Sequence, residues 1–139
     1  MNTLPGYPLL TGAPLRVLFG ALFSALVGAL SCAGCSQALP THDEATGGNP
    51  RQGRETIVRY GCGACHTIDG VPNARGLVGP PLAGIGERSY IAGHLPNTAE
   101  NLMRWIEHPQ RFDPQSAMPE LGVTQADARD IVAYLLHQP

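Results

Sequence analysis

The sequence predicts an all-α domain of three or four helices wrapped around a large bound group. The last segment carries apolar residues at helical spacing, at Ala128, Ile131, Val132 and Leu135. No segment shows the alternation of apolar and polar residues that is typical of a strand. Residues 67–97 are rich in glycine and proline. An irregular stretch of that length fits a compact domain best when it surrounds a rigid group that serves as its core.

Composition restricts both size and partners. The 139 residues allow one domain, and 43% of them are hydrophobic while 14% are charged. The formal net charge is −2, and the chain contains nine arginines and no lysine. No basic patch is present, so we do not expect nucleic acid as a partner.

Residues 1–35 have the pattern of an export signal. Arg16 precedes an apolar run from Val17 to Leu30, which is shorter than the about 20 residues that a membrane span needs. The run ends in small residues before Cys35, and this end resembles the lipobox of bacterial lipoproteins. Cys35 is therefore the expected lipid anchor, with Cys32 as the second choice, although a plain cleaved signal and an uncleaved anchor stay open. The expected location is the bacterial periplasm, tethered to a membrane.

The segments that follow are expected in this order. Residues 36–49 are small and polar, which predicts a flexible tether. A domain then occupies residues 50–139, with a first helix that starts near Pro50 and runs to Gly61. Gly53 lowers the helix propensity of this segment, and either a close helix crossing or a neutral surface position explains it.

Two more helices have clear boundaries. Thr98 is the expected N-cap of a helix that Pro109 ends. Thr124 and Asp127 have the spacing of a capping box, so the last helix is expected to begin there.

The sequence Cys62-Gly63-Ala64-Cys65-His66 is the attachment pattern of a c-type haem. On a helical turn both cysteines and the histidine share one face, so the two thiols and the imidazole can reach one flat macrocycle. Met118, followed by proline in a loop, is the expected second axial ligand. Ligation by histidine and methionine is typical of electron-carrying cytochromes c. Met103 lies on an apolar helical face, where methionine more often fills a core.

Over residues 50–137 the chain resembles a class I cytochrome c, like the small bacterial monohaem carriers and the domains fused to haem-copper oxidase subunits. The matching segments are Gly61–His66, Gly79–Leu82, Leu102–Ile106 with Pro109, Ala117–Pro119 and Asp130–Leu135. The resemblance implies the class I cytochrome c fold around one covalent haem. It also implies that the carbonyl of Pro80 accepts from His66, that Trp105 lies beside the haem, and that Arg88 and Tyr90 bind the propionates. Arg111 is a weaker candidate for a propionate.

The expected function is one-electron transfer by a membrane-tethered shuttle between respiratory complexes and a terminal oxidase or dehydrogenase. The protein is then not an enzyme. The alternatives are a haem enzyme or gas sensor with an open sixth position, and a thiol-redox or zinc site at Cys62 and Cys65. Three histidines are possible rivals of Met118 as iron ligands, namely His94, His108 and His137. Without lysines, docking on a partner is expected to be apolar or neutral.

Overall fold

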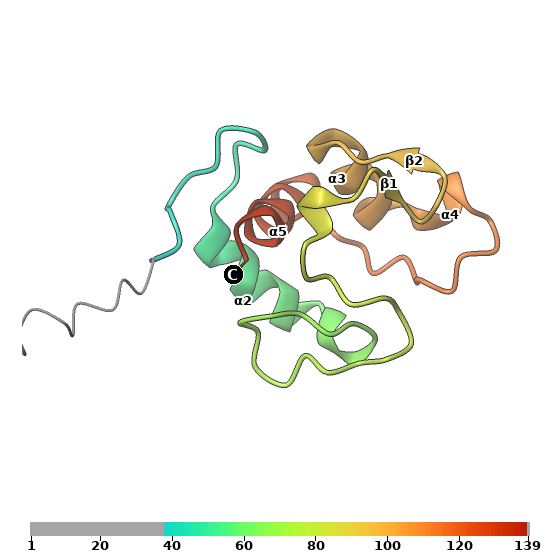
Figure 1. Cartoon of the computed structure of the whole chain (residues 1–139), viewed down its shortest axis with the longest axis horizontal. Helices are drawn as coiled ribbons and strands as arrows, with labels where there is room; N and C mark the ends of the chain where they lie inside the picture. The colour runs from blue at the N-terminus through green and yellow to red at the C-terminus, as the bar shows by residue number, and fades with distance from the viewer. Residues whose placement is uncertain (1–37, 139) are drawn as a thin grey trace, which may run out of the picture. The chain divides into compact units, whose positions relative to one another are not determined.

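A computed structural model describes residues 38–138. The predicted export signal, with Cys32 and Cys35, lies outside these residues. The described part contains four α-helices, two short 3₁₀ helices and one two-stranded ribbon (Figure 1). In chain order they are α2 (Pro50–Arg59), η2 (Cys62–Ala64), η3 (Ile85–Glu87), β1 (Tyr90–Ile91), β2 (Leu95–Pro96), α3 (Ala99–Glu107), α4 (Pro109–Phe112) and α5 (Gln125–His137). The all-α class is confirmed. None of the described helices has the length and apolar character that a membrane crossing requires.

Local signals set the start of α2. The side chain of Asn49 accepts hydrogen bonds from the backbone N–H groups of Arg51 and Gln52, which have no partner inside the helix. Pro50 follows as the first helical residue, where its missing N–H costs nothing. The predicted start of the first helix is therefore confirmed.

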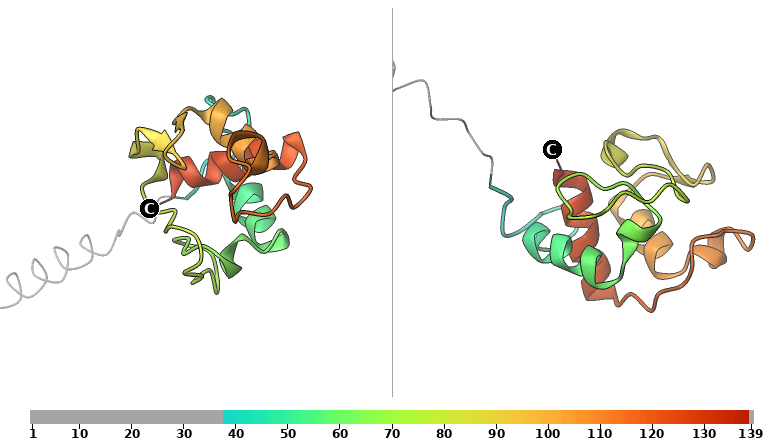
Figure 2. Two further views of the ribbon diagram at one scale, coloured as in Figure 1. Left: turned by 90° about the vertical axis from the view of Figure 1, so that its right-hand side faces the viewer. Right: turned by 90° about the horizontal axis from the view of Figure 1, so that it is seen from below.

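Gly53 lies at a close crossing between α2 and α5, which make the most extensive contact between elements (Figures 1 and 2). A Cβ atom at this position would lie 1.9 Å from the backbone oxygen of Asp130 and 2.9 Å from Cβ of Tyr134. The close-crossing explanation of Gly53 is thus the correct one.

Both predicted N-caps are present. Thr98 accepts from the backbone N–H of Asn101 and starts α3, and Thr124 accepts from that of Asp127 and starts α5. Helix α5 lies in the core, where Ala128, Val132 and Ala133 have no exposed surface. The predicted apolar stripe of α5 is buried against α2 and α3.

Residues 67–97 run irregularly, as predicted, apart from η3 and the ribbon. In the ribbon, β1 and β2 pair antiparallel, with Tyr90 opposite Pro96 and Ile91 opposite Leu95. The sequence shows no strand pattern for this ribbon. Two residues per strand are too few to show an alternating pattern in the sequence.

Residues 43–49 belong by composition to the expected tether, yet they pack against α5. Asp43 is 8% exposed and accepts from the backbone N–H and the hydroxyl of Thr46, at 2.8 and 2.7 Å. Its other carboxylate oxygen lies 2.8 Å from Nε2 of His137. The backbone N–H of Asn49 donates to the carboxylate of Asp130 at 2.7 Å. Composition missed these contacts because they join residues that are far apart in the sequence.

Candidate cofactor site

A cavity of about 560 Å³ opens between the loops and α3 and α5 in the described residues. This volume lies within the roughly 300–1,000 Å³ of typical ligand and cofactor sites. Its lining is predominantly apolar. All eight predicted site residues line it, which are Cys62, Cys65, His66, Pro80, Arg88, Tyr90, Trp105 and Met118.

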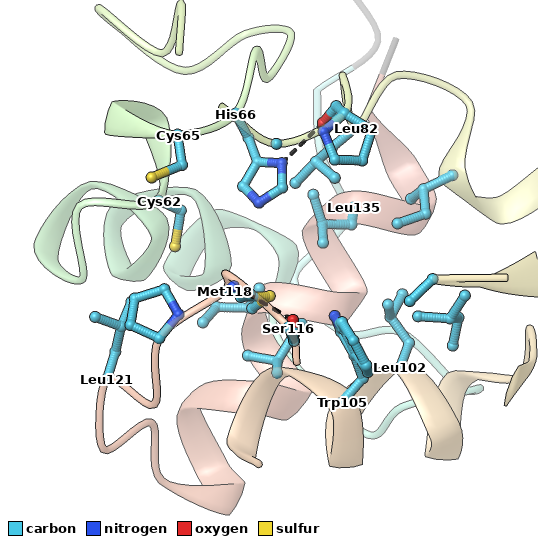
Figure 3. Close-up of a pocket in the computed structure, with 18 of the residues that line it drawn as sticks. Cys62, Cys65, His66, Leu82, Leu102, Trp105, Ser116, Met118, Leu121 and Leu135 are labelled. Atoms are coloured by element: carbon cyan, nitrogen blue, oxygen red, sulfur yellow. Dashed lines mark hydrogen bonds between the residues drawn. The ribbon is translucent and has the colours of Figure 1, made fainter. Parts of the chain in front are cut away.

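Figure 3 shows how the reactive groups are arranged around the cavity. His66 points in from one side and Met118 lies on the other, while Cys62 and Cys65 are placed along the edge. The tight turn of η2 produces this placement, because the backbone N–H of Cys65 and of His66 both donate to the carbonyl of Cys62, at 3.2 and 3.0 Å.

The carbonyl of Pro80 lies 2.8 Å from Nδ1 of His66. A carbonyl can only accept, so the proton of the neutral imidazole belongs on Nδ1, and the lone pair of Nε2 is left for a metal. Gly79 makes this contact possible, because a Cβ atom there would lie 2.3 Å from Cε1 of His66. The backbone N–H of Gly79 donates to the carbonyl of Cys65 at 2.8 Å and connects the loop to the turn of residues 62–66.

Met118 lies in an irregular segment between α4 and α5. Its backbone N–H donates to the hydroxyl of Ser116 at 3.3 Å, and its carbonyl accepts from Nε2 of Gln110 at 2.6 Å. The backbone N–H of Ser116 donates in turn to the carbonyl of Asp113 at 3.0 Å. Hydrogen bonds of side chains and turns, not regular secondary structure, therefore position the thioether.

The remaining predicted residues lie at the cavity in different ways. Trp105 is 8% exposed, and its ring packs against Phe112 with a centroid distance of 6.5 Å. Tyr90 is 61% exposed at the rim. The guanidinium of Arg88 donates to the carbonyls of Pro81 and Ala83, so it stabilises the loop that carries Pro80.

The rivals of Met118 lie elsewhere, because Met103, His94, His108 and His137 are absent from the cavity lining. Arg111, the weaker candidate for a propionate, is absent from it too. The three histidines each lie near a carboxylate, with His94 4.0 Å from Asp113 and His108 3.6 Å from Glu120.

The thiol of Cys62 differs from that of a reactive redox cysteine. Burial raises the pKa of Cys62 above its usual value, whereas reactive cysteines have a lowered pKa. A zinc site needs four ligands around one point, and in residues 38–138 no cluster of three or more histidine, cysteine, aspartate or glutamate side chains is present.

Sequence reasoning missed three residues that support the site. Gln110 holds the carbonyl of Met118, and Gly79 leaves room for His66. Asn97 donates to the carbonyls of Ile85 and Arg88 at 2.6 and 2.8 Å. The position of Gly79 beside Pro80 was a usable signal, but nothing local in the sequence marks the two amide side chains.

The residues present fit a haem. The cavity is apolar, and Nδ1 of His66 is already hydrogen-bonded to a carbonyl. The thioether of Met118 lies opposite this imidazole, and the two cysteine thiols lie on the cavity wall. An all-α domain with this site defines a c-type haem-binding protein. The family model described as cytochrome c matches residues 51–139, and the chain belongs to this family. Membership of the family makes it a haem electron-transfer protein.

Curated relatives add a context. The chain is 36% identical over 85 residues to cytochrome c oxidase subunit 2 of Alkalihalophilus pseudofirmus, a match that covers 60% of this chain and 24% of the relative. It is 29% identical over 86 residues to the subunit 2 of Bacillus subtilis, covering 56% of this chain and 24% of the relative. The subunit 2 of Bacillus sp. strain PS3 is 33% identical over 66 residues, with 46% and 18% covered. The chain thus spans about a quarter or less of the length of these relatives.

Proposed function

We propose that the chain is a one-electron carrier with a single haem c, attached through thioether bonds at Cys62 and Cys65, with His66 and Met118 as axial ligands. The observation that carries the proposal is the placement of these four side chains around one apolar cavity. The bound haem would supply a reversible one-electron couple at its iron.

The protein's own residues adapt the site to this task. The carbonyl of Pro80 orients the imidazole of His66, and the neutral thioether of Met118 favours the lower charge of reduced iron. Buried side chains such as Ile57 and Leu102, 1% and 2% exposed, line the cavity and limit the access of water. With both His66 and Met118 bound to the iron, oxygen and peroxide would find no coordination site.

The substitution Met118→Ala tests the proposal against a haem enzyme or gas sensor. We expect the purified haemoprotein to show a covalent haem by its pyridine haemochrome spectrum and to bind little carbon monoxide when reduced. Met118→Ala should lower the reduction potential and create carbon monoxide binding, whereas Met103→Leu should change neither. An unchanged potential in Met118→Ala would refute the ligand assignment, and strong carbon monoxide binding by the unaltered protein would favour the sensor or enzyme.

A terminal oxidase is the proposed partner, because the relatives named above are oxidase subunits. The rim of the cavity supports an apolar contact. Tyr90, Val78 and Leu121 line the cavity yet are 61%, 76% and 41% exposed, and Leu77 beside them is 88% exposed. No charged residue lies between Arg75 and Glu87. A rate of electron transfer to a purified oxidase that is nearly independent of ionic strength would support apolar docking, and a steep fall with salt would contradict it.

We further propose a lipid anchor at Cys35, or at Cys32, that tethers the carrier to a bacterial membrane on the periplasmic side. The support is the sequence of residues 1–35. A tether raises the local concentration of a carrier near its partner and lowers the need for charge steering. Mass spectrometry of the mature amino terminus tests it, since an unmodified cleaved end would remove the anchor from the proposal.

A further inference from the structure

Helix α4 is a short but firmly held element. Pro109 ends α3 and begins α4, and its side chain is fully buried. Phe112 at the other end of α4 packs against Trp105 of α3, and the guanidinium of Arg104 lies 5.2 Å from the Phe112 ring centroid. The backbone of α4 is therefore held at a fixed position relative to the cavity.

Gln110 extends from α4 to the methionine loop, which we define as residues 113–123. Its Nε2 donates to the carbonyl of Met118 at 2.6 Å and, more weakly, to that of Ser116 at 3.4 Å. Both partners are carbonyls, so the amide nitrogen must face them. The amide oxygen Oε1 is buried and has no hydrogen-bond partner in the described residues.

We infer that Gln110 is a positioning residue that keeps the thioether of Met118 in the cavity opposite His66. The inference rests on the proposed function, in which Met118 is an iron ligand. The backbone of the methionine loop lacks helix or strand hydrogen bonds. The carboxamide of Gln110 connects the peptide of Met118 to α4, and so limits how far the ligand can leave the iron.

Gln138 offers a matched control at the other side of the domain. Its Nε2 also donates to two carbonyls, those of Leu82 at 2.7 Å and Leu135 at 3.1 Å, and its Oε1 is likewise buried without a partner. Within residues 38–138, no hydrogen bond joins Gln138 to the methionine loop. Loss of this amide removes the same kind of hydrogen bonds without touching Met118.

The test compares Gln110→Met and Gln110→Glu with Gln138→Met and Gln138→Glu in the reduced haemoprotein at neutral pH. Gln110→Met removes the donor at nearly constant volume. Gln110→Glu replaces it with a carboxylate that cannot donate and repels both carbonyls. We expect carbon monoxide affinity to rise about tenfold for Gln110→Met, as for the loss of about 1.4 kcal/mol, and further for Gln110→Glu. The Gln138 variants should bind carbon monoxide with the affinity of the unaltered protein.

A second readout is independent of the haem's redox activity. Alkylation of Met118 by iodoacetate, followed by mass spectrometry, should be faster in both Gln110 variants, with Met103 as the internal reference. Equal carbon monoxide affinity and equal alkylation in the Gln110 and Gln138 variants would overturn the inference. If the unaltered protein binds carbon monoxide as tightly as Met118→Ala does, the ligand assignment fails instead, so the two failures are distinguishable. If Gln110→Glu does not fold, Gln110→Met alone decides.

Discussion

Helices α2 and α5 pack so closely that the backbone of α2 at Gly53 contacts the backbone and a side chain of α5. No space remains there for a larger side chain. Around the cavity, by contrast, irregular chain is held by single polar side chains that donate to carbonyls, as Arg88, Asn97 and Gln110 do. The difference teaches that the two regions respond to different changes. Added volume disrupts the helix pair, while the loss of a hydrogen bond or of a close contact disturbs the cavity wall.

Gly53→Ala is expected to have the largest effect on the helix pair. The new methyl group would meet the backbone of Asp130 at 1.9 Å, and backbone cannot rotate away. We expect a loss of about 3 kcal/mol in the free energy of unfolding, measured by urea denaturation of the haemoprotein. Gln52→Ala, one residue earlier and exposed, should stay within about 0.5 kcal/mol. Equal stability of both variants would contradict the tight crossing.

Gly79→Ala applies the same change to the cavity wall. The methyl group would meet the imidazole of His66 at 2.3 Å, but this neighbour is a side chain that can tilt. We therefore expect a smaller loss of about 2 kcal/mol, together with an altered reduction potential and haem spectrum. Leu77→Ala, at an 88% exposed position of the same loop, is the matched control and should leave the haem spectrum unchanged.

Tyr134→Phe tests a hydrogen bond that connects the helix pair to the loop around the cavity. The hydroxyl of this α5 residue donates to the carbonyl of Asp69 at 2.6 Å, and burial raises the pKa of Tyr134. Removing the hydroxyl leaves that carbonyl without this donor, so we expect a loss of about 1 kcal/mol in urea denaturation. An unchanged midpoint would show that the loop does not depend on α5 here.

The smallest expected effect is a pH dependence at the start of α5. The hydrogen bond from Tyr60 at 2.8 Å, with those from Thr124 and Arg59, lowers the pKa of Asp127 below its usual value. The unfolded chain then binds this proton at higher pH than the folded chain does. The stabilisation that Asp127 provides is therefore present above the pKa of the unfolded state, and it is lost as the pH falls through the pKa of the folded state.

Tyr60→Phe should raise the pKa of Asp127 and reduce the loss of stability at acid pH that Asp127 causes. NMR titration of the Asp127 carboxyl group, with urea denaturation between neutral and acid pH, provides the measurement. A pKa that does not move would show that the Tyr60 contact is not the main cause.

The helices could be predicted because their signals are local. Thr98, Thr124 and Pro50 act within one turn of their own position, and the apolar stripe of α5 repeats within a few residues. The gathering of eight site residues at one cavity followed from the haem-attachment pattern together with the family resemblance, and the cavity lining contains all of them.

The supporting contacts could not be predicted in the same way. Asp43 meets His137, and Gln138 meets Leu82, only because the folded chain brings distant segments together. Composition alone places residues 43–49 in a tether, since small polar residues also occur in packed turns. Arg88 was expected at a propionate, but its carbonyl partners depend on the course of the loop around it.

The contact between Asp43 and His137 also has a consequence for protein engineering. It brings the two ends of the folded unit to one place, because the residues involved stand near its first and last described positions. A unit whose ends meet can be spliced into a surface loop of a host protein, or circularly permuted through a short linker, without pulling its core apart. The same property suits a module that evolution attaches to larger chains.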